Sequence, residues 1–127
     1  MKKSISFLIL FLMLSPLAFA GRLAPVTKAK VTVTTPGTAV VLGTVSETFY
    51  SATICAEEEN TQAVVVGDSS VDETQATRRG DVIWGGTNTT DCVWLGGNDN
   101  VNGNLADYYI DAEVAGEGVT ITRYVRS

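Results

Sequence analysis

The sequence contains no histidine, and this absence removes most of the familiar catalytic and metal-binding arrangements. Serine and cysteine nucleophiles usually depend on a histidine base, and the two cysteines alone cannot complete a zinc site. The chain also has no G-x-S-x-G nucleophile motif, no G-x-x-x-x-G-K phosphate loop and no dinucleotide fingerprint. We therefore expect no cofactor and no metal, and paired carboxylates are the remaining route to catalysis.

Asp111 and Glu113 form the most suitable pair of carboxylates. On one face of a strand they would lie about 6.6 Å apart, at the lower edge of the spacing found in inverting glycosidases. Asp107 and Asp111 would lie about 13 Å apart, which is too far. Alternating carboxylates are also typical of the solvent face of an antiparallel sheet, and we favour that interpretation. A histidine-free hydrolase is thus the weakest hypothesis, and we predict that the chain is not an enzyme.

Trp84 and Trp94 are the residues best suited to binding. Each ends a short apolar run beside a Gly-Gly pair, which places two large rings near loop edges. Such rings can stack on sugars, but they also cover the ends of small cores, and the second role is the simpler interpretation. The loop after Trp94 adds four polar residues to this candidate binding surface: Asn98, Asp99, Asn100 and Asn102.

Three short motifs have ordinary structural explanations. Residues 98–103 half-match a calcium loop, but the bidentate glutamate required at its twelfth position is Tyr109. The tripeptide 79–81, Arg-Gly-Asp, is one that integrins recognise, and its glycine is also a typical turn residue before a strand. The tripeptide 88–90 is a glycosylation acceptor, which has no role in a bacterial chain. None of these motifs changes the expected binding surface.

The elements that must position these residues are β-strands. Short runs rich in β-branched residues alternate with Gly, Pro and Asn turns, and no window of eleven residues has a helical period. The expected strands are 29–34, 38–42, 49–56, 63–66, 82–84, 92–95, 108–114 and 119–125. This pattern predicts an all-β fold, a small jelly-roll-like β-sandwich of about seven to eight short antiparallel strands.

Alternation along the closing strands predicts which side chains face the core. The set expected inside is Tyr108, Ile110, Ala112 and Val114, and the set expected to face solvent or a partner is Tyr109, Asp111 and Glu113. Arg123 interrupts the apolar set of the final strand, so we expect it at a rim or a subunit contact. The connections 68–80 and 96–104 are long enough to be functional or mobile.

The first twenty residues have the layout of a secretory signal peptide. Lys2 and Lys3 precede an apolar run, and Ala18-Phe19-Ala20 is a small-x-small cleavage site. A membrane anchor is the alternative, but the apolar run of about a dozen residues is too short to span a bilayer. We therefore expect a cleaved segment 1–20, an extended N-terminal arm 21–28 and a single β-sandwich domain 29–127. The protein would be exported (periplasmic, cell-surface or extracellular), bacterial or phage-encoded, and without a transmembrane segment in its mature part.

Cys55 and Cys92 are the only cysteines. An even number of cysteines in an exported chain predicts a disulfide, and closing a loop of about 38 residues would contribute about 4 kcal/mol. Two buried free thiols are the alternative. Beyond residue 20, seven basic side chains face fourteen acidic ones. This balance argues against nucleic acid, which requires a basic stripe, and against anionic membrane surfaces.

Four segments resemble the small β-sandwich domains of phage virions. They are 60–71, which begins with Asn60-Thr61, and 80–86, 104–112 and 116–124. They resemble the family patterns NT…V.VG.S.V, G..L.PG, DL..IYV.A and G..V.V.Y over roughly residues 49–124, with Gly85 in place of the loop proline. The family comprises capsid-decoration, head-fibre and tail-associated proteins. The resemblance implies a β-sandwich without catalytic residues that assembles as trimers or arrays, although virion proteins normally lack a signal peptide and a disulfide.

The leading functional hypothesis is a non-enzymatic exported structural protein that self-associates or decorates a larger particle or surface. The alternative is a secreted or surface binding module for glycans or a receptor, using Trp84, Trp94 and the loop 96–104. The histidine-free hydrolase is the third.

Overall fold

The fold is described by a computed structural model over residues 21–87, 90–96 and 103–127. Within these ranges the chain forms ten strands and one 3-10 helix: β1 (Leu23–Thr32), β2 (Val40–Val41), β3 (Thr48–Phe49), β4 (Ser51–Ala56), β5 (Val64–Gly67), β6 (Asp81–Ile83), β7 (Cys92–Gly96), β8 (Gly103–Asn104), η1 (Leu105–Asp107), β9 (Tyr109–Ala112) and β10 (Gly118–Arg126). No helix in the described part is long and apolar enough to cross a membrane. The predicted signal peptide lies outside the described residues.

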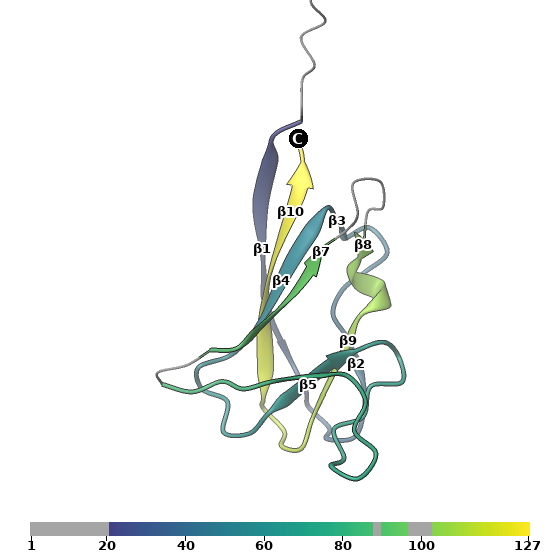
Figure 1. The fold of residues 1–127 in the computed structure, drawn as a ribbon, viewed down its shortest axis with the longest axis vertical. Coiled ribbons are helices and arrows are strands. Elements are labelled where there is room, and N and C mark those ends of the chain that lie inside the picture. Colours follow the sequence, from purple (N-terminus) through teal and green to yellow (C-terminus); the bar gives the residue numbers. More distant parts are fainter. Residues whose placement is uncertain (1–20, 88–89, 97–102) are drawn as a thin grey trace, which may run out of the picture.

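The strands form two four-stranded antiparallel sheets and one small two-stranded ladder (Figure 1). Sheet A has the order β1-β10-β4-β7, sheet B has the order β2-β9-β5-β6, and β3 pairs with β8. The pairing is nested, because the first strand pairs with the last, the second with the ninth, and so on inward to β5 and β6. A long hairpin wound into two sheets in this way is a jelly roll, as the sequence predicts.

The eight strands of the two main sheets overlap the eight predicted runs, with boundaries that differ by a few residues. The segment 21–28 is extended, and from Leu23 onward it already belongs to β1, where Leu23 lies opposite Arg126. β8 and η1 are only two and three residues long, too short for a sequence pattern to predict them. Asn104 caps η1 by accepting a hydrogen bond from the Ala106 amide.

The core lies between the two sheets and is wholly aliphatic and aromatic. Its buried members are Val33, Leu42, Phe49, Ala52, Ile54, Ala56, Val64, Val66, Ile83, Leu105, Ile110, Ala112, Val119 and Ile121. The inward set on β4 is every second residue, as alternation predicts. Burying a side chain such as Ile54 stabilises the fold by about 1.5–3 kcal/mol relative to exposing it.

The face predicted for the strand 108–114 is wrong at two positions. Asp111 is 1% exposed rather than on the solvent face, and Val114 is 41% exposed rather than in the core. Asp111 pairs across the ladder with Val65, which is also fully buried, so the outer face of sheet B is covered here. The turn around Gly37 provides this cover, and its amide donates a hydrogen bond to Asp111. Val114 is exposed because β9 already ends at Ala112.

The disulfide prediction is confirmed. Cys55 on β4 and Cys92 on β7 lie directly opposite each other in the ladder and are bonded across a sequence separation of 37 residues. Since β7 is the edge strand of sheet A, the bond ties this edge to the interior strand β4.

A buried polar clasp joins the connection after β4 to the hairpin before β10. The Asn60 amide donates to the Gly118 carbonyl and accepts from the Gly118 amide, both at 2.9 Å. The carboxylate of Glu117, only 4% exposed, accepts from the amide and hydroxyl of Thr61. Asn60-Thr61 and Glu117-Gly118 belong to two of the segments that resemble virion domains, and here they contact each other.

Candidate functional site

Three neighbouring rows of paired residues on the outer face of sheet A carry no charge, and the row beyond them pairs Leu23 with Arg126. Side chains opposite each other in neighbouring strands point to the same side of a sheet, and the intervening residues Ala52, Ile54 and Ile121 are buried in the core. Two rows cross all four strands: Thr27, Thr122, Thr53 and Trp94, and beside it Pro25, Tyr124, Ser51 and Gly96. A third row contains Thr120, Cys55 and Cys92. None of these side chains carries a charge.

Trp94 lies on this face and is 67% exposed. A Cβ at position 96 would overlap the six-membered ring of Trp94, so the indole lies over Gly96 and occupies the space that a side chain there would fill. Aromatic rings bind sugars through their faces, and threonine and serine hydroxyls can donate and accept hydrogen bonds. The arrangement therefore suits an uncharged, hydroxyl-rich ligand.

Trp84, the second tryptophan of the predicted binding surface, follows a strand of sheet B and not of sheet A. Trp84 is 49% exposed and follows β6 of sheet B, where its amide and carbonyl bond to Asp91. In the described part the two tryptophan rings do not pair with each other, whereas Phe49 and Tyr108 do. The other predicted members, Asn98, Asp99, Asn100 and Asn102, lie outside the described residues, as does most of the calcium-like segment.

The carboxylates considered for hydrolysis each have a structural partner. Asp111 accepts hydrogen bonds from the amides of Gly37 and Ala112 at 3.0 and 2.9 Å. Glu113 lies 3.4 Å from Arg78. Within the described residues no group of three His, Cys, Asp or Glu side chains is placed to hold a metal ion.

Basic and acidic residues are separated in a way that the sequence analysis did not detect. The segments 21–32 and 118–127, which contain β1 and β10, include five basic residues and no acidic one: Arg22, Lys28, Lys30, Arg123 and Arg126. All fourteen acidic residues lie between 33 and 117, where Arg78 and Arg79 are the only basic ones. Counting charges by segment would have found this pattern.

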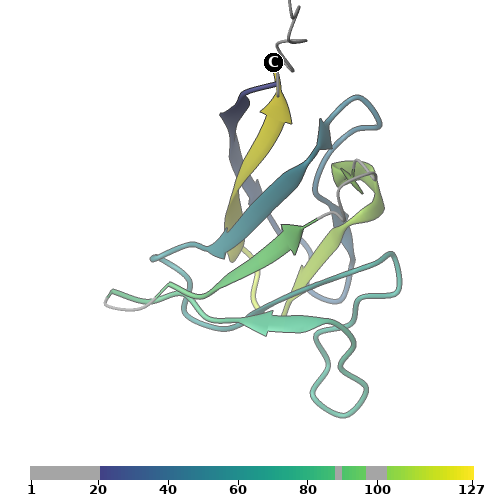
Figure 2. The same ribbon diagram turned by 45° about the horizontal axis from the view of Figure 1, so that its top comes forward.

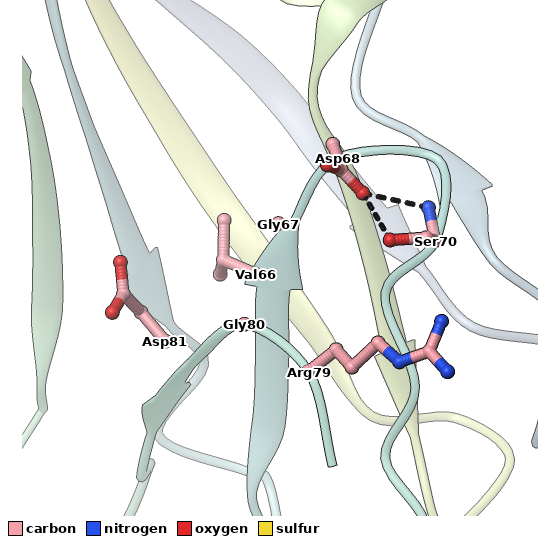
Figure 3. A pocket seen from close by; sticks show the side chains of 7 residues that line it. All are labelled: Val66, Gly67, Asp68, Ser70, Arg79, Gly80 and Asp81. Carbon is pink, nitrogen blue, oxygen red and sulfur yellow. Dashed lines mark hydrogen bonds between the residues drawn. The ribbon is translucent and has the colours of Figure 1, made fainter. Parts of the chain in front are cut away.

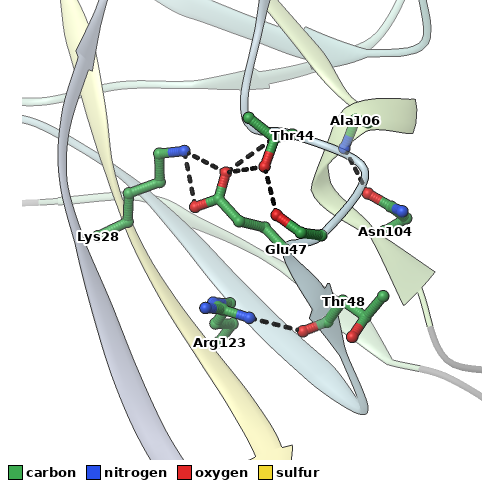
Figure 4. Close-up of polar contacts among 8 residues, drawn as sticks. Lys28, Thr44, Glu47, Thr48, Asn104, Ala106 and Arg123 are labelled. Atoms are coloured by element: carbon green, nitrogen blue, oxygen red, sulfur yellow. Dashed lines mark hydrogen bonds and ion pairs between the residues drawn. The ribbon is translucent and has the colours of Figure 1, made fainter.

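The two lysines of this set are neutralised locally. Lys28 donates to both carboxylate oxygens of Glu47, at 2.8 and 2.7 Å, and Lys30 lies 3.8 Å from Glu59. Figure 4 shows that Glu47 also accepts from the Thr44 amide. The bonds from Lys28 and Thr44 hold the pKa of the Glu47 carboxyl below its usual range.

The arginines of the set gather where β1 begins and β10 ends. Among the described residues Arg22, Arg123 and Arg126 belong to no ion pair. Arg126 lies over the Tyr50 ring, 4.7 Å from its centroid, and lines a hollow of about 170 Å³ together with Thr48, Phe49, Tyr50 and Val125. Arg123 donates through Nη1 to the Thr48 carbonyl, and its Nε is buried without a partner among the described residues. We call this region the arginine end.

A second hollow, of about 260 Å³, lies in the connection between β5 and β6. It is lined by Val66, Gly67, Asp68, Ser70, Arg79, Gly80 and Asp81 (Figure 3). Asp68 and Asp81 lie on either side of the two glycines, and Arg79 extends to the same side as Ser70. Gly80 has φ +122, and a Cβ there would meet the Val66 carbonyl, which explains the glycine inside the Arg-Gly-Asp tripeptide.

The carboxylates of this connection keep its end acidic. A hydrogen bond from the Ser70 hydroxyl, and then one from its amide, lower the pKa of Asp68. The Thr77 hydroxyl does the same for Asp72. Burial, and then the nearby charge of Asp111, raise the pKa of Glu73. We call residues 67–81 the acidic hairpin.

Comparison with known proteins gives no match to a protein-family model, to a curated protein or to a solved structure.

Proposed function

We propose that the chain is a non-enzymatic structural subunit that associates with further copies of itself in an exported assembly. The observation that carries this proposal is the separation of charge between the arginine end and the rest of the chain. One copy thus carries two surfaces of opposite sign, and each can serve as the partner of the other on a second copy. The resemblance to virion decoration and fibre domains, which form arrays, agrees with this function.

Charge at the contact decides such an association more than net charge does. At physiological salt the screening length is about 8 Å, so repulsion between acidic molecules acts only at short range. The free edge of β1 is a less suitable contact. It carries Pro25, Lys28, Lys30 and a bulge between Lys28 and Val31, features that discourage pairing between sheet edges.

The test is the oligomeric state of the purified protein, measured by sedimentation velocity over a concentration series. We expect species larger than the monomer at about 0.1 M salt, and their dissociation at about 1 M salt, where the screening length falls to about 3 Å. A monomer at every concentration and salt level would refute the proposal.

A second candidate function, binding of a neutral saccharide, is favoured by one specific observation: Trp94 lies exposed on an uncharged, hydroxyl-bearing sheet face. A glycan array followed by calorimetry tests it. Trp94→Ala should abolish binding, and Gly96→Ala should weaken it by displacing the ring. Trp84→Ala, the matched control, should leave binding unchanged. An array without signal would rule this function out.

A further inference from the structure

The arginine end and the acidic hairpin lie at opposite ends of the long axis of the molecule. Figure 1 shows the start of β1 and the end of β10 together at one end, and the connection between β5 and β6 at the other. The turned view in Figure 2 keeps the same separation. Two complementary surfaces on opposite ends cannot satisfy each other within one copy.

The arginine end has the properties of a site for a carboxylate. Its hollow admits a small group beside Arg126, whose planar guanidinium can bind a carboxylate through two parallel hydrogen bonds. The other residues that line the hollow, Thr48, Phe49, Tyr50 and Val125, carry no negative charge that would compete with a bound carboxylate.

The acidic hairpin has the complementary properties. Asp68 and Asp81 are exposed on either side of a hollow of about 260 Å³. In the described part neither carboxylate belongs to an ion pair. Arg79 is the one cation lining this hollow, and it lies on the side of Ser70, away from Asp81 (Figure 3).

We propose that the hollow beside Arg126 is a carboxylate-binding site, and that its occupant is the acidic hairpin of a second copy of this chain. The inference rests on the proposed self-association and assigns its contact. Because the two surfaces differ, the contact is heterologous, and because they lie at opposite ends, it does not close in a dimer. Copies therefore join head to tail into assemblies larger than a dimer, an open chain or, where the rotation between copies closes, a ring.

The first experiment compares two variants that change the net charge equally. Arg126→Gln removes a cation from the arginine end, and Arg79→Gln removes one from the acidic hairpin. We expect Arg126→Gln to weaken association about tenfold or more, and Arg79→Gln to strengthen it. Sedimentation velocity gives both constants, and thermal melts establish that each variant is folded. Equal effects of the two variants would show that net charge alone governs association and would overturn the assignment.

The second experiment mixes two blocked copies. Arg126→Gln retains its acidic hairpin, whereas Asp68→Asn with Asp81→Asn retains its arginine end. Each variant alone should sediment as a monomer, and an equimolar mixture should form a dimer and nothing larger. A wild-type protein that stops at a dimer would contradict the head-to-tail contact. Wild-type association that all these substitutions leave intact would refute this contact but not self-association, whereas a monomeric wild type would refute both.

Discussion

At the residue scale, the stability of this small domain depends on a few buried polar side chains. Asn60 reproduces with its amide the two hydrogen bonds that a paired strand residue would make to Gly118. Glu117 accepts three hydrogen bonds from two donors of Thr61, its amide and its hydroxyl. These bonds hold the connection after β4 against the turn that leads into β10.

Replacing Asn60 with alanine should destabilise the fold by about 1–3 kcal/mol. The substitution leaves the buried Gly118 amide without its partner, whereas the Gly118 carbonyl keeps the bond from the Glu57 amide. One unsatisfied buried group costs about 1–3 kcal/mol. Urea unfolding measures the loss. Gln62→Ala, at a nearby exposed position, is the matched control and should change stability by less than about 0.5 kcal/mol. Equal stability of the two variants would contradict a role for the clasp.

Glu47→Gln should make stability less dependent on pH. Because the folded pKa of Glu47 is lowered, its ionised form stabilises the fold above the ordinary carboxyl pKa of 4.5, and this contribution is lost as pH falls through the folded value. We expect the variant to be less stable than wild type by about 1 kcal/mol at neutral pH, and the difference to vanish in acid. Unfolding curves between neutral and acid pH test this, with the exposed Glu58→Gln as control. A difference that persists in acid would exclude the charge as its cause.

At the element scale, the disulfide fixes the least supported strand of sheet A. Among the residues that the structure describes, β7 pairs on one side only, with β4. The covalent bond joins residues that already face each other in the ladder, so it restrains the unfolded chain without demanding a new arrangement of the folded one.

Replacing Cys55 and Cys92 with alanine should lower stability by about 4 kcal/mol, the chain-entropy estimate for a loop of this length. The native sheet should persist at low temperature, since neither cysteine belongs to the buried core. Guanidinium unfolding with and without reductant checks the value. Wild type under reducing conditions should match the double variant. A loss below about 1 kcal/mol would mean that the unfolded chain gains little freedom when the bond is cut.

The strands were more predictable from the sequence than the surfaces. Runs of β-branched residues and turn residues are local features of the sequence, so they predict the eight strands of the two main sheets. Alternation failed at Asp111 because a turn far away in the sequence covers the outer face of sheet B, and no local pattern contains that information. Trp94 is selected from the sequence because it is a tryptophan. The position of its ring over Gly96 depends on the side-chain conformation in the folded strand β7, which the sequence does not give. The arginine end brings together the start of β1 and the end of β10, which are far apart in the sequence and pair in one ladder. The overall composition of the chain therefore does not reveal it.

At the scale of the whole molecule, the nested pairing makes almost every sheet contact distant in sequence. β1 cannot pair until β10 is available, and β10 also separates β1 from β4 in sheet A. Loop closure must therefore precede most of the stabilising contacts.

Refolding should accordingly be slow for a domain of this size, with a main phase between about 10 ms and several seconds. Stopped-flow tryptophan fluorescence of the oxidised protein measures it. The variant without Cys55 and Cys92 should refold more slowly still, because the bond keeps β4 close to β7. Refolding within microseconds, or equal rates for the two proteins, would contradict this account.

The segregation of charge also gives the molecule a permanent electric dipole along its long axis. A dipole of this kind aligns in the field of a charged support. On a cationic surface the molecule would adsorb by the acidic hairpin and hold the ends of β1 and β10 outward. A densely coated surface would then expose a layer of arginines. Its outer charge would be positive, whereas the net charge of the dissolved protein is negative.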